Sequence, residues 1–173
     1  MGIIVWQDMV NGGGAYPMWY VTYLTNALQP LLRYAPDGKL LWGLLGRGSA
    51  RSREEYSREL ADTVAALGQH PSIGCWVPFN EGWGQFDAEK ATKALRALDP
   101  TRLVDEASGW FDRGGGDVHS IHNYFYPLRI RPKARTVALS EYGGIAWPMP
   151  GHEPPRKTYG YGTVRNRAEL TGR

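Results

Sequence analysis

Two glutamates in the sequence each follow a short apolar segment, in positions where a carboxylate can do chemistry. Glu81 comes after the segment 73–79, and Glu141 closes the segment 136–141 before a glycine-rich turn. In a parallel α/β sheet or barrel, the C-terminal ends of the strands open onto one common rim. The sequence therefore predicts that these two carboxylates share a site, although a lone glutamate at a strand end is usually a helix cap or a surface charge.

Two carboxyl groups on one rim can cleave a glycosidic bond. One donates a proton to the leaving oxygen, and the other attacks the anomeric carbon or activates a water molecule that does so. A separation of about 5–5.5 Å favours retention of configuration, whereas a wider gap leaves room for water and gives inversion. Repulsion between the two charges favours one group keeping its proton near neutral pH.

The elements that must position these glutamates are predicted from hydrophobic patterning. Continuous apolar segments indicate strands covered on both faces, as in a parallel sheet. Helical segments lie between several of them, and strand alternating with helix predicts an α/β fold with parallel strands. The predicted strands are 2–7, 73–79, 102–107, 117–124 and 136–141, and the predicted helices are 17–32, 52–67 and 87–100.

The helix boundaries are predicted from capping signals. Ser52 with Glu55 three residues later forms a capping box, and the helix that follows places its apolar side chains on one face. The next helix starts at Asp87 and buries one apolar side. The expected buried faces are Tyr56, Leu60, Val64 and Leu67 in the first helix and Ala91, Ala94, Leu95 and Leu98 in the second.

Composition excludes several other classes. The chain has 173 residues with 42% hydrophobic and 21% charged residues, which are globular values. The net charge of +3 is spread along the chain, so no nucleic-acid partner is expected. Cys75 is the only cysteine, which rules out an intramolecular disulfide and a cysteine-based zinc site. We find no signal-peptide pattern and no membrane-spanning segment, and expect a cytoplasmic protein with no membrane partner.

Three segments together resemble the catalytic (β/α)8 barrel of glycoside hydrolase family 2: GIIVWQDMVNGGG, HPSIGCWVPFNEGWGQFD and ALSEYGG. This family includes β-galactosidases, β-glucuronidases and β-mannosidases, which are retaining enzymes. The similarity runs from residue 2 to about residue 150. It implies a retaining hydrolase of terminal β-linked sugars that needs no cofactor and for which no metal ligands can be matched.

The resemblance also implies roles for individual residues. Glu81 matches the general acid/base at the end of barrel strand four, and Glu141 matches the nucleophile at the end of strand seven. Asn80 matches the residue that hydrogen-bonds the sugar 2-hydroxyl, a contact that strengthens in the transition state. Tyr124 resembles the tyrosine that holds the nucleophile. Trp83 is expected to give the acid/base a drier, aromatic setting that favours its protonated form.

Other candidate substrate-binding residues have two open interpretations each. Asp8 could reach a sugar hydroxyl or cap the glycine-rich turn that follows it. His122 lies two residues before Tyr124, so both share one side of a strand, and it either lines the rim or is a hydrogen-bonded core histidine. Trp147 and Trp110 could stack on a sugar face or pack in the core.

Three further residues near the predicted site are not expected to be catalytic themselves. Asp105 and Glu106 end the strand predicted at 102–107. Glu106 could point into the site or could instead pair with an arginine behind it. His119 is expected to be structural.

A complete barrel takes about 250 residues, and only strands three to seven can be matched here. The expected fold class is therefore an incomplete (β/α)8 TIM barrel: residues 1–150 form the partial core, and 151–173 form a loop-rich tail leading toward strand eight, with a short helix near 163–171. The expected partner is a β-glycoside substrate. The alternative is a catalytically inactive carbohydrate-binding or non-functional truncated chain.

Overall fold

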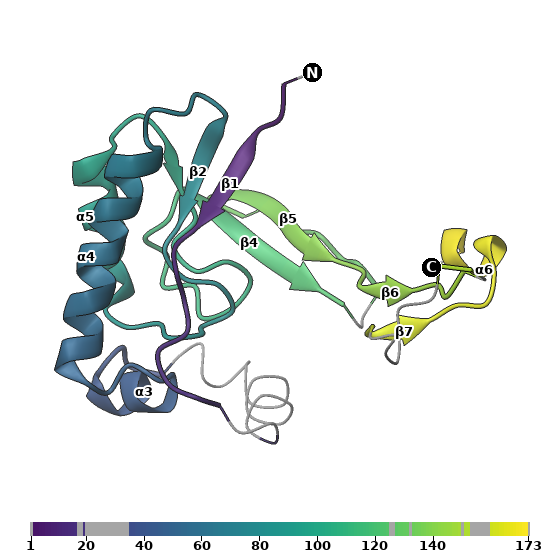
Figure 1. The fold of residues 1–173 in the computed structure, drawn as a ribbon, viewed down its shortest axis with the longest axis horizontal. Helices are drawn as coiled ribbons and strands as arrows, with labels where there is room; N and C mark the ends of the chain where they lie inside the picture. The colour runs from purple at the N-terminus through teal and green to yellow at the C-terminus, as the bar shows by residue number, and fades with distance from the viewer. Residues whose placement is uncertain are drawn as a thin grey trace.

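The computed structural model describes residues 2–16, 19, 35–124, 127–131, 133–149, 151–152 and 160–172. The helix predicted over 17–32 lies almost wholly outside these residues. Within them the chain is mixed α/β, with a body of helices and strands from which a strand pair and a C-terminal segment extend (Figure 1).

Three strands form a parallel sheet in the body of the molecule. They are β1 (Val5–Asp8), β2 (Ile73–Val77) and β3 (Leu103–Val104), in that order across the sheet. Helices α3 (Lys39–Leu44) and α4 (Ala50–Leu67) lie between β1 and β2 in the chain, and α5 (Ala88–Leu98) lies between β2 and β3. The alternation of strand and helix predicted from the sequence is confirmed here, whereas α3 was not predicted.

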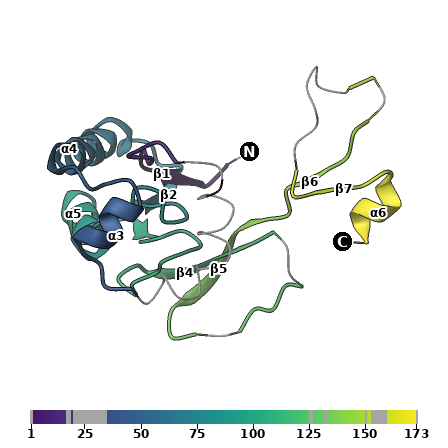
Figure 2. The ribbon, with the colours of Figure 1, turned by 90° about the horizontal axis from the view of Figure 1, so that it is seen from below.

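A second parallel pair consists of β4 (Val118–Asn123) and β5 (Thr136–Tyr142). The two strands lie beside each other and lead away from the helices (Figure 2). Their ladder contains an irregularity, because Ile121 pairs with Leu139 whereas His122 pairs with Glu141. One extra residue, Ser140, is therefore accommodated in β5.

The core lies between the three-stranded sheet and helices α4 and α5. Tyr56, Leu60 and Val64 on α4 are buried as predicted, and they belong to one apolar cluster with Trp76 of β2 and Leu95 of α5. The α5 face differs from the prediction, because Ala88, Thr92 and Leu95 are buried while Ala94 and Leu98 are exposed. The buried side of α5 is thus formed by Ala88, Thr92 and Leu95, and Ala91 packs beside them against the core.

The helix starts also differ from the prediction. Ser49, not Ser52, is the N-cap of α4, and its side chain accepts a hydrogen bond from the backbone nitrogen of Ser52. The Ser52 hydroxyl instead accepts a hydrogen bond from Arg47 Nη1 at 2.8 Å. Asp87 precedes α5 without capping it through its side chain. The Asp37 carboxylate, from a remote part of the chain, accepts from the backbone nitrogen of Ala88 at 3.0 Å.

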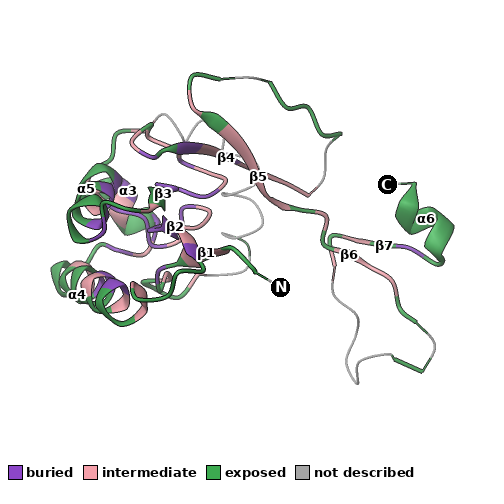
Figure 3. Ribbon diagram, turned by 90° about the horizontal axis from the view of Figure 1, so that it is seen from above, coloured by how far each residue is buried: buried purple, intermediate pink, exposed green. Residues whose placement is uncertain are grey.

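The strands are less evenly covered than predicted. All but one residue of β2 is buried, in agreement with a strand packed on both faces, but β1 alternates between half-buried and exposed, and β5 contains no buried residue. Figure 3 shows that β5 is of intermediate exposure over most of its length, whereas buried residues gather where the helices face β2. The reason is that β1 is an edge strand and β5 pairs with only one described strand.

The C-terminal segment contains β6 (Ile145–Ala146), β7 (Gly162–Thr163) and α6 (Arg167–Thr171). The short helix expected near 163–171 is confirmed as α6, whereas the parallel pairing of β6 with β7 was not predicted. Among the helices of the described residues, none combines the length and the apolar composition that crossing a membrane requires.

Candidate functional site

Glu81 lies in a tight turn that follows β2. Asn80 forms a single parallel bridge with Ser108, and the backbone nitrogen of Glu81 donates to the carbonyl oxygen of Ser108 at 2.9 Å. Glu81 adopts a left-handed backbone conformation with φ of 52°, which is uncommon for a residue other than glycine. The next residue, Gly82, is also left-handed, and a Cβ there would lie 2.2 Å from the ring of Phe111. The fold thus holds Glu81 in an unfavourable local conformation, as often occurs at functional sites.

Glu141 is aimed by the irregularity in the β4–β5 ladder. The extra residue Ser140 shifts the register so that Glu141 becomes the partner of His122. Bulges of this kind commonly redirect a side chain next to a functional site. As a result the Ser140 hydroxyl contacts Ser120 at 2.9 Å while the adjacent Glu141 carboxylate reaches the same cluster as His122.

The two carboxylates meet at the hydroxyl group of Tyr124. Tyr124 Oη donates to Glu81 Oε1 at 2.8 Å and also makes a short hydrogen bond to Glu141 Oε2. One oxygen of each glutamate and one ring nitrogen of His122 all lie within 4.8 Å of one another. Residues that are remote in the sequence therefore form one compact cluster at the C-terminal ends of β2, β4 and β5.

His122 is the buried member of the cluster. Its side chain is fully buried, whereas the side chains of Glu81 and Glu141 are 14% and 42% exposed. Nδ1 lies 2.9 Å from Glu81 Oε1, and Nε2 lies 2.9 Å from Ser108 Oγ and 3.7 Å from Glu141 Oε1. Of the two interpretations left open by the sequence, His122 is thus a hydrogen-bonded interior histidine that also touches the candidate catalytic acid.

The environment keeps the Tyr124 hydroxyl protonated. Burial raises the pKa of Tyr124 far above its usual range, and the hydrogen bonds to Glu141 and Glu81 raise it further. Tyr124 therefore acts as a donor between two acceptors. The charges of the cluster also act on Asp8. Partial burial raises the pKa of its carboxyl group, the charge of Glu141 raises it further, and His122 lowers it.

An open cavity of about 450 Å³ lies beside Glu141. Its volume is in the range usual for small-molecule sites. Glu141 and Asp8 supply acidic groups to its lining, and Trp6 supplies an aromatic ring. The remaining lining residues are Ile4, Val77, Ser108, Ala138, Leu139 and Ser140. The structure thus places Asp8 in the lining of this cavity.

The other predicted substrate-binding residues lie at different distances from the cluster. Asn80 precedes Glu81, and its Oδ1 atom is buried without a hydrogen-bond partner among the described residues. Buried acceptors are seldom left unsatisfied, so this atom is available to a ligand. Trp83 packs edge-on against Tyr16, with ring centroids 4.6 Å apart. Trp147 follows β6 and is half-buried, and no contact places it in the cluster within the described residues.

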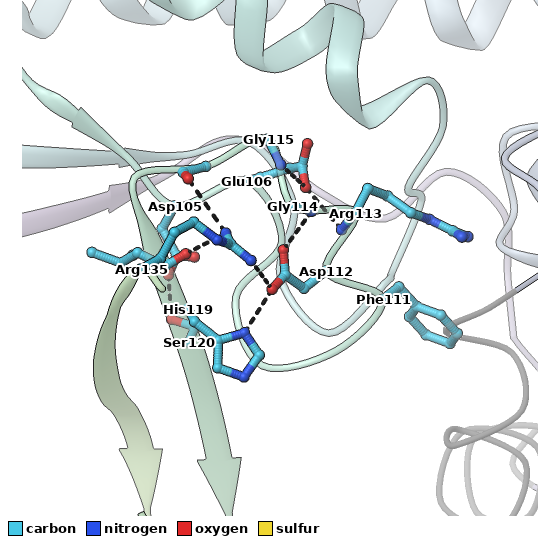
Figure 4. Close-up of polar contacts among 12 residues, drawn as sticks. Asp105, Glu106, Phe111, Asp112, Arg113, Gly114, Gly115, His119, Ser120 and Arg135 are labelled. Atoms are coloured by element: carbon cyan, nitrogen blue, oxygen red, sulfur yellow. Dashed lines mark hydrogen bonds and ion pairs between the residues drawn. The ribbon is translucent and has the colours of Figure 1, made fainter. Parts of the chain in front are cut away.

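The loop between β3 and β4 explains three further residues (Figure 4). Glu106 is buried and accepts backbone hydrogen bonds from Arg113 and Gly115 at 2.9 and 3.1 Å, so it stabilises this loop and does not point at Glu81 or Glu141. His119 Nδ1 lies 2.7 Å from Asp112 Oδ2, which agrees with a structural role. Trp110 packs against a buried apolar cluster and is therefore a core residue.

Several residues at the site were not singled out from the sequence. Trp6 lines the cavity, Ser108 and Ser140 contact the cluster, and Tyr161 stacks on Tyr124 with ring centroids 4.5 Å apart. Trp6 could have been predicted, because it lies two residues before Asp8 in β1 and side chains two residues apart in a strand share a face. Tyr161 lies in a segment without periodicity, and the sequence carries no signal for it.

Glu81, His122 and Glu141 have the spacing of a metal-binding group. Their ligating atoms, however, already have partners. Tyr124 is hydrogen-bonded to both carboxylates, and the two nitrogens of His122 face Glu81 and Ser108. The observed arrangement is that of a hydrogen-bonded acid cluster.

Comparison of the chain with models of known protein families found no match, and neither did comparison with curated proteins. A functional assignment therefore depends on the residues and geometry of the site.

Proposed function

We propose that the chain is a retaining glycoside hydrolase of the family 2 type that cleaves terminal β-linked sugars. The observation that carries this proposal is the pairing of two carboxylates: one oxygen of each lies within 4.8 Å of the other, and Tyr124 is hydrogen-bonded to both groups. This spacing is close to the roughly 5 Å separation that goes with retention.

In the first step Glu141 is the nucleophile. One carboxylate oxygen attacks the anomeric carbon, the bond to the leaving oxygen breaks, and Glu81 transfers its proton to that oxygen. Tyr124 donates to Glu141 Oε2, so this oxygen is restrained and Oε1 is the one that attacks. Because Glu81 Oε1 is held by His122 and Tyr124, we assign proton delivery to Oε2.

In the second step water releases the sugar. Glu81, now ionised, takes a proton from the water, the hydroxide attacks the anomeric carbon, and the bond to Glu141 breaks. Esterification removes the negative charge of Glu141 between the steps, so Glu81 no longer faces that charge. Asn80, whose Oδ1 lacks a partner, is the proposed contact for the sugar 2-hydroxyl, and Asp8 for another hydroxyl group.

The fold belongs to the same proposal. Parallel strands with active groups at their C-terminal ends are the arrangement of a TIM barrel, and we propose that β1 to β5 correspond to barrel strands three to seven. The sheet β1–β2–β3 and the pair β4–β5 would then be adjacent portions of one barrel wall. We further propose that the enzyme works in the cytoplasm, where the single thiol, the buried Cys75, stays reduced.

The test is hydrolysis of nitrophenyl β-galactoside, β-glucuronide and β-mannoside by the wild type and three variants. We expect Glu141→Gln to abolish turnover, because it removes the nucleophile. Glu81→Gln should lower kcat by about 10²- to 10⁴-fold, the usual contribution of a general acid/base. Glu59→Gln is the matched control, since Glu59 is an exposed residue of helix α4 and is not part of the cluster. The activity of this variant should equal that of the wild type.

Other outcomes distinguish the alternatives. Hydrolysis that survives in Glu141→Gln would refute the assignment of the nucleophile. Sugar binding in calorimetry without turnover in the wild type would identify a carbohydrate-binding protein instead. Neither binding nor turnover with any of the three sugars would reject the proposed function.

A further inference from the structure

A chain of hydroxyl groups connects a buried aspartate to the candidate acid/base. Asp105 is almost wholly buried, and Ser120 Oγ makes a short hydrogen bond to its Oδ2 atom (Figure 4). Ser120 Oγ lies 2.9 Å from Ser140 Oγ, which lies 3.4 Å from Ser108 Oγ. The chain of contacts then continues through His122, whose Nε2 lies 2.9 Å from Ser108 and whose Nδ1 lies 2.9 Å from Glu81.

The protons of this chain can be counted. Each serine hydroxyl has one hydrogen to donate. The geometry offers the Ser120 hydroxyl as a donor to both Asp105 and Ser140, but its single hydrogen can serve only one of them. If Asp105 is ionised, its charge takes this hydrogen, so Ser140 donates to Ser120 and Ser108 donates to Ser140. The contact between Ser108 and His122 then needs a proton on Nε2. The state of Asp105 thus selects the tautomer of a histidine that it does not touch.

We propose that Asp105 is a positioning residue that acts through Ser120, Ser140 and Ser108 to keep the proton of His122 on Nε2. The lone pair of Nδ1 then faces Glu81 Oε1 and offers this oxygen no hydrogen bond. The opposite tautomer would donate from Nδ1 to Glu81 Oε1, so the tautomer decides whether the ring donates to the candidate acid/base. The catalytic consequence rests on the proposed function, whereas the tautomer itself does not.

The surroundings of Asp105 fit this role. Burial raises the pKa of Asp105 to about 6, and among its charged neighbours His122 lowers it while Asp112 and Asp8 raise it. The carboxyl group is therefore ionised at pH 8, the pH at which the proton count above applies. Asp105 is shielded from water. Among the described side chains, Ser120 donates the hydrogen bond that its carboxylate accepts.

The test is the ring ¹⁵N spectrum of His122 in the full chain at pH 8, since protonated and unprotonated ring nitrogens have distinct shifts. The chain has four histidines, and the signals of His122 are assigned by their loss in His122→Asn. We expect Nε2 to be protonated in the wild type. In Ser108→Ala the ratio of the Nε2–H to the Nδ1–H form should fall about fivefold, the effect of one ordinary hydrogen bond.

Asp105→Leu, which neither donates nor accepts, should lower the ratio in the same direction. Combining it with Ser108→Ala should add nothing, because the connection is already broken. Ser57→Ala, which removes an exposed hydroxyl from α4, is the control and should leave the ratio unchanged. A purely structural role of the serines would lower thermal stability without moving this ratio.

An Nδ1–H tautomer or an imidazolium ion in the wild type would overturn the proposal, as would an unchanged ratio in folded Ser108→Ala. A response to Ser108→Ala but not to Asp105→Leu would reject Asp105 as the controlling group. If the chain does not hydrolyse glycosides, the proposed function fails but the tautomer measurement still decides this inference.

Discussion

Tyr124 has one hydroxyl proton and two carboxylate neighbours, and this sets its expected role. Its Oη atom is hydrogen-bonded to Glu81 and to Glu141. Because the tyrosine stays protonated, it neutralises part of the repulsion between the two groups and restrains the oxygen that does not attack. The residue-level chemistry therefore depends on the hydroxyl group as much as on the acids.

We predict that Tyr124→Phe lowers kcat on nitrophenyl glycosides by on the order of 10²-fold, in line with the loss of one aimed donor at an active site. The ring remains, so its stacking on Tyr161 and the thermal stability should change little. Steady-state kinetics and a melting curve check both statements. The Tyr142→Phe variant is the matched control, because Tyr142 is 73% exposed. Equal kcat values for Tyr124→Phe and wild type would contradict the role.

At the residue scale the sequence predicts the chemical identity of the site but not its connections. Glu81 and Glu141 could be named because each follows a predicted strand, and Asn80 and Tyr124 because their segments resemble those of glycoside hydrolase family 2. The contact between Ser140 and Ser120 could not be predicted, since it depends on a one-residue irregularity in the β4–β5 ladder. Alternation along an ideal strand would have placed Ser140 and Glu141 on opposite faces.

At the scale of elements, the junction between α5 and the strands depends on Asp99. This residue ends α5 and is buried. Its carboxylate accepts hydrogen bonds from Trp76 Nε1 at 2.9 Å and from the hydroxyl of Thr101 at 2.6 Å, and it forms an ion pair with Arg102. Burial by itself would raise the pKa of Asp99, but these hydrogen bonds outweigh it and the pKa is lowered.

This lowered pKa predicts acid sensitivity. A carboxyl group with a folded-state pKa below its unfolded value of about 3.9 stabilises the fold above that pH and loses the contribution as the pH falls. We predict that Asp99→Asn lowers the free energy of unfolding at pH 7 by on the order of 2 kcal/mol, the cost of losing hydrogen bonds to a charged group. The difference from wild type should shrink toward pH 2.

Urea denaturation at pH 7 and at pH 3 measures this difference. Asp62→Asn, at an exposed position of α4, serves as the control and should match the wild type at both pH values. A deficit in Asp99→Asn that is the same at both pH values would show that shape, not charge, holds the junction together.

The existence and type of the major elements could be predicted, but their ends and exposed faces could not in every case. The local pattern predicted Ser52 as the N-cap of α4, whereas the cap is Ser49, three residues earlier. The Ser52 hydroxyl is instead hydrogen-bonded to Arg47. The start of α5 is capped by Asp37, a contact between remote residues that no local pattern contains. Burial of β1 and β5 was overpredicted, since an apolar segment does not reveal whether a partner covers it.

At the scale of the whole molecule, the two sheets and the C-terminal segment come together at the site. Asp8 and Trp6 of β1 line the cavity opposite Glu141 of β5, so both sheets border the same space. The C-terminal segment reaches back to it through Tyr161, whose backbone nitrogen donates to Gly144 and whose ring covers Tyr124. The barrel form stays a prediction, while the convergence of strand ends at one place follows from parallel pairing.

The central claim is that Glu141 attacks the sugar and forms a covalent intermediate. It is tested by incubating the full chain with an activated 2-deoxy-2-fluoro-β-glycoside of the sugar that it hydrolyses, followed by intact-mass and peptide mass spectrometry. Fluorine at position 2 slows the release step, because it destabilises the positively charged transition state, so the intermediate accumulates. We predict one added glycosyl group per chain, located on Glu141. An adduct on Glu81 or any other residue, or no adduct in a protein that turns over the parent glycoside, would contradict the account.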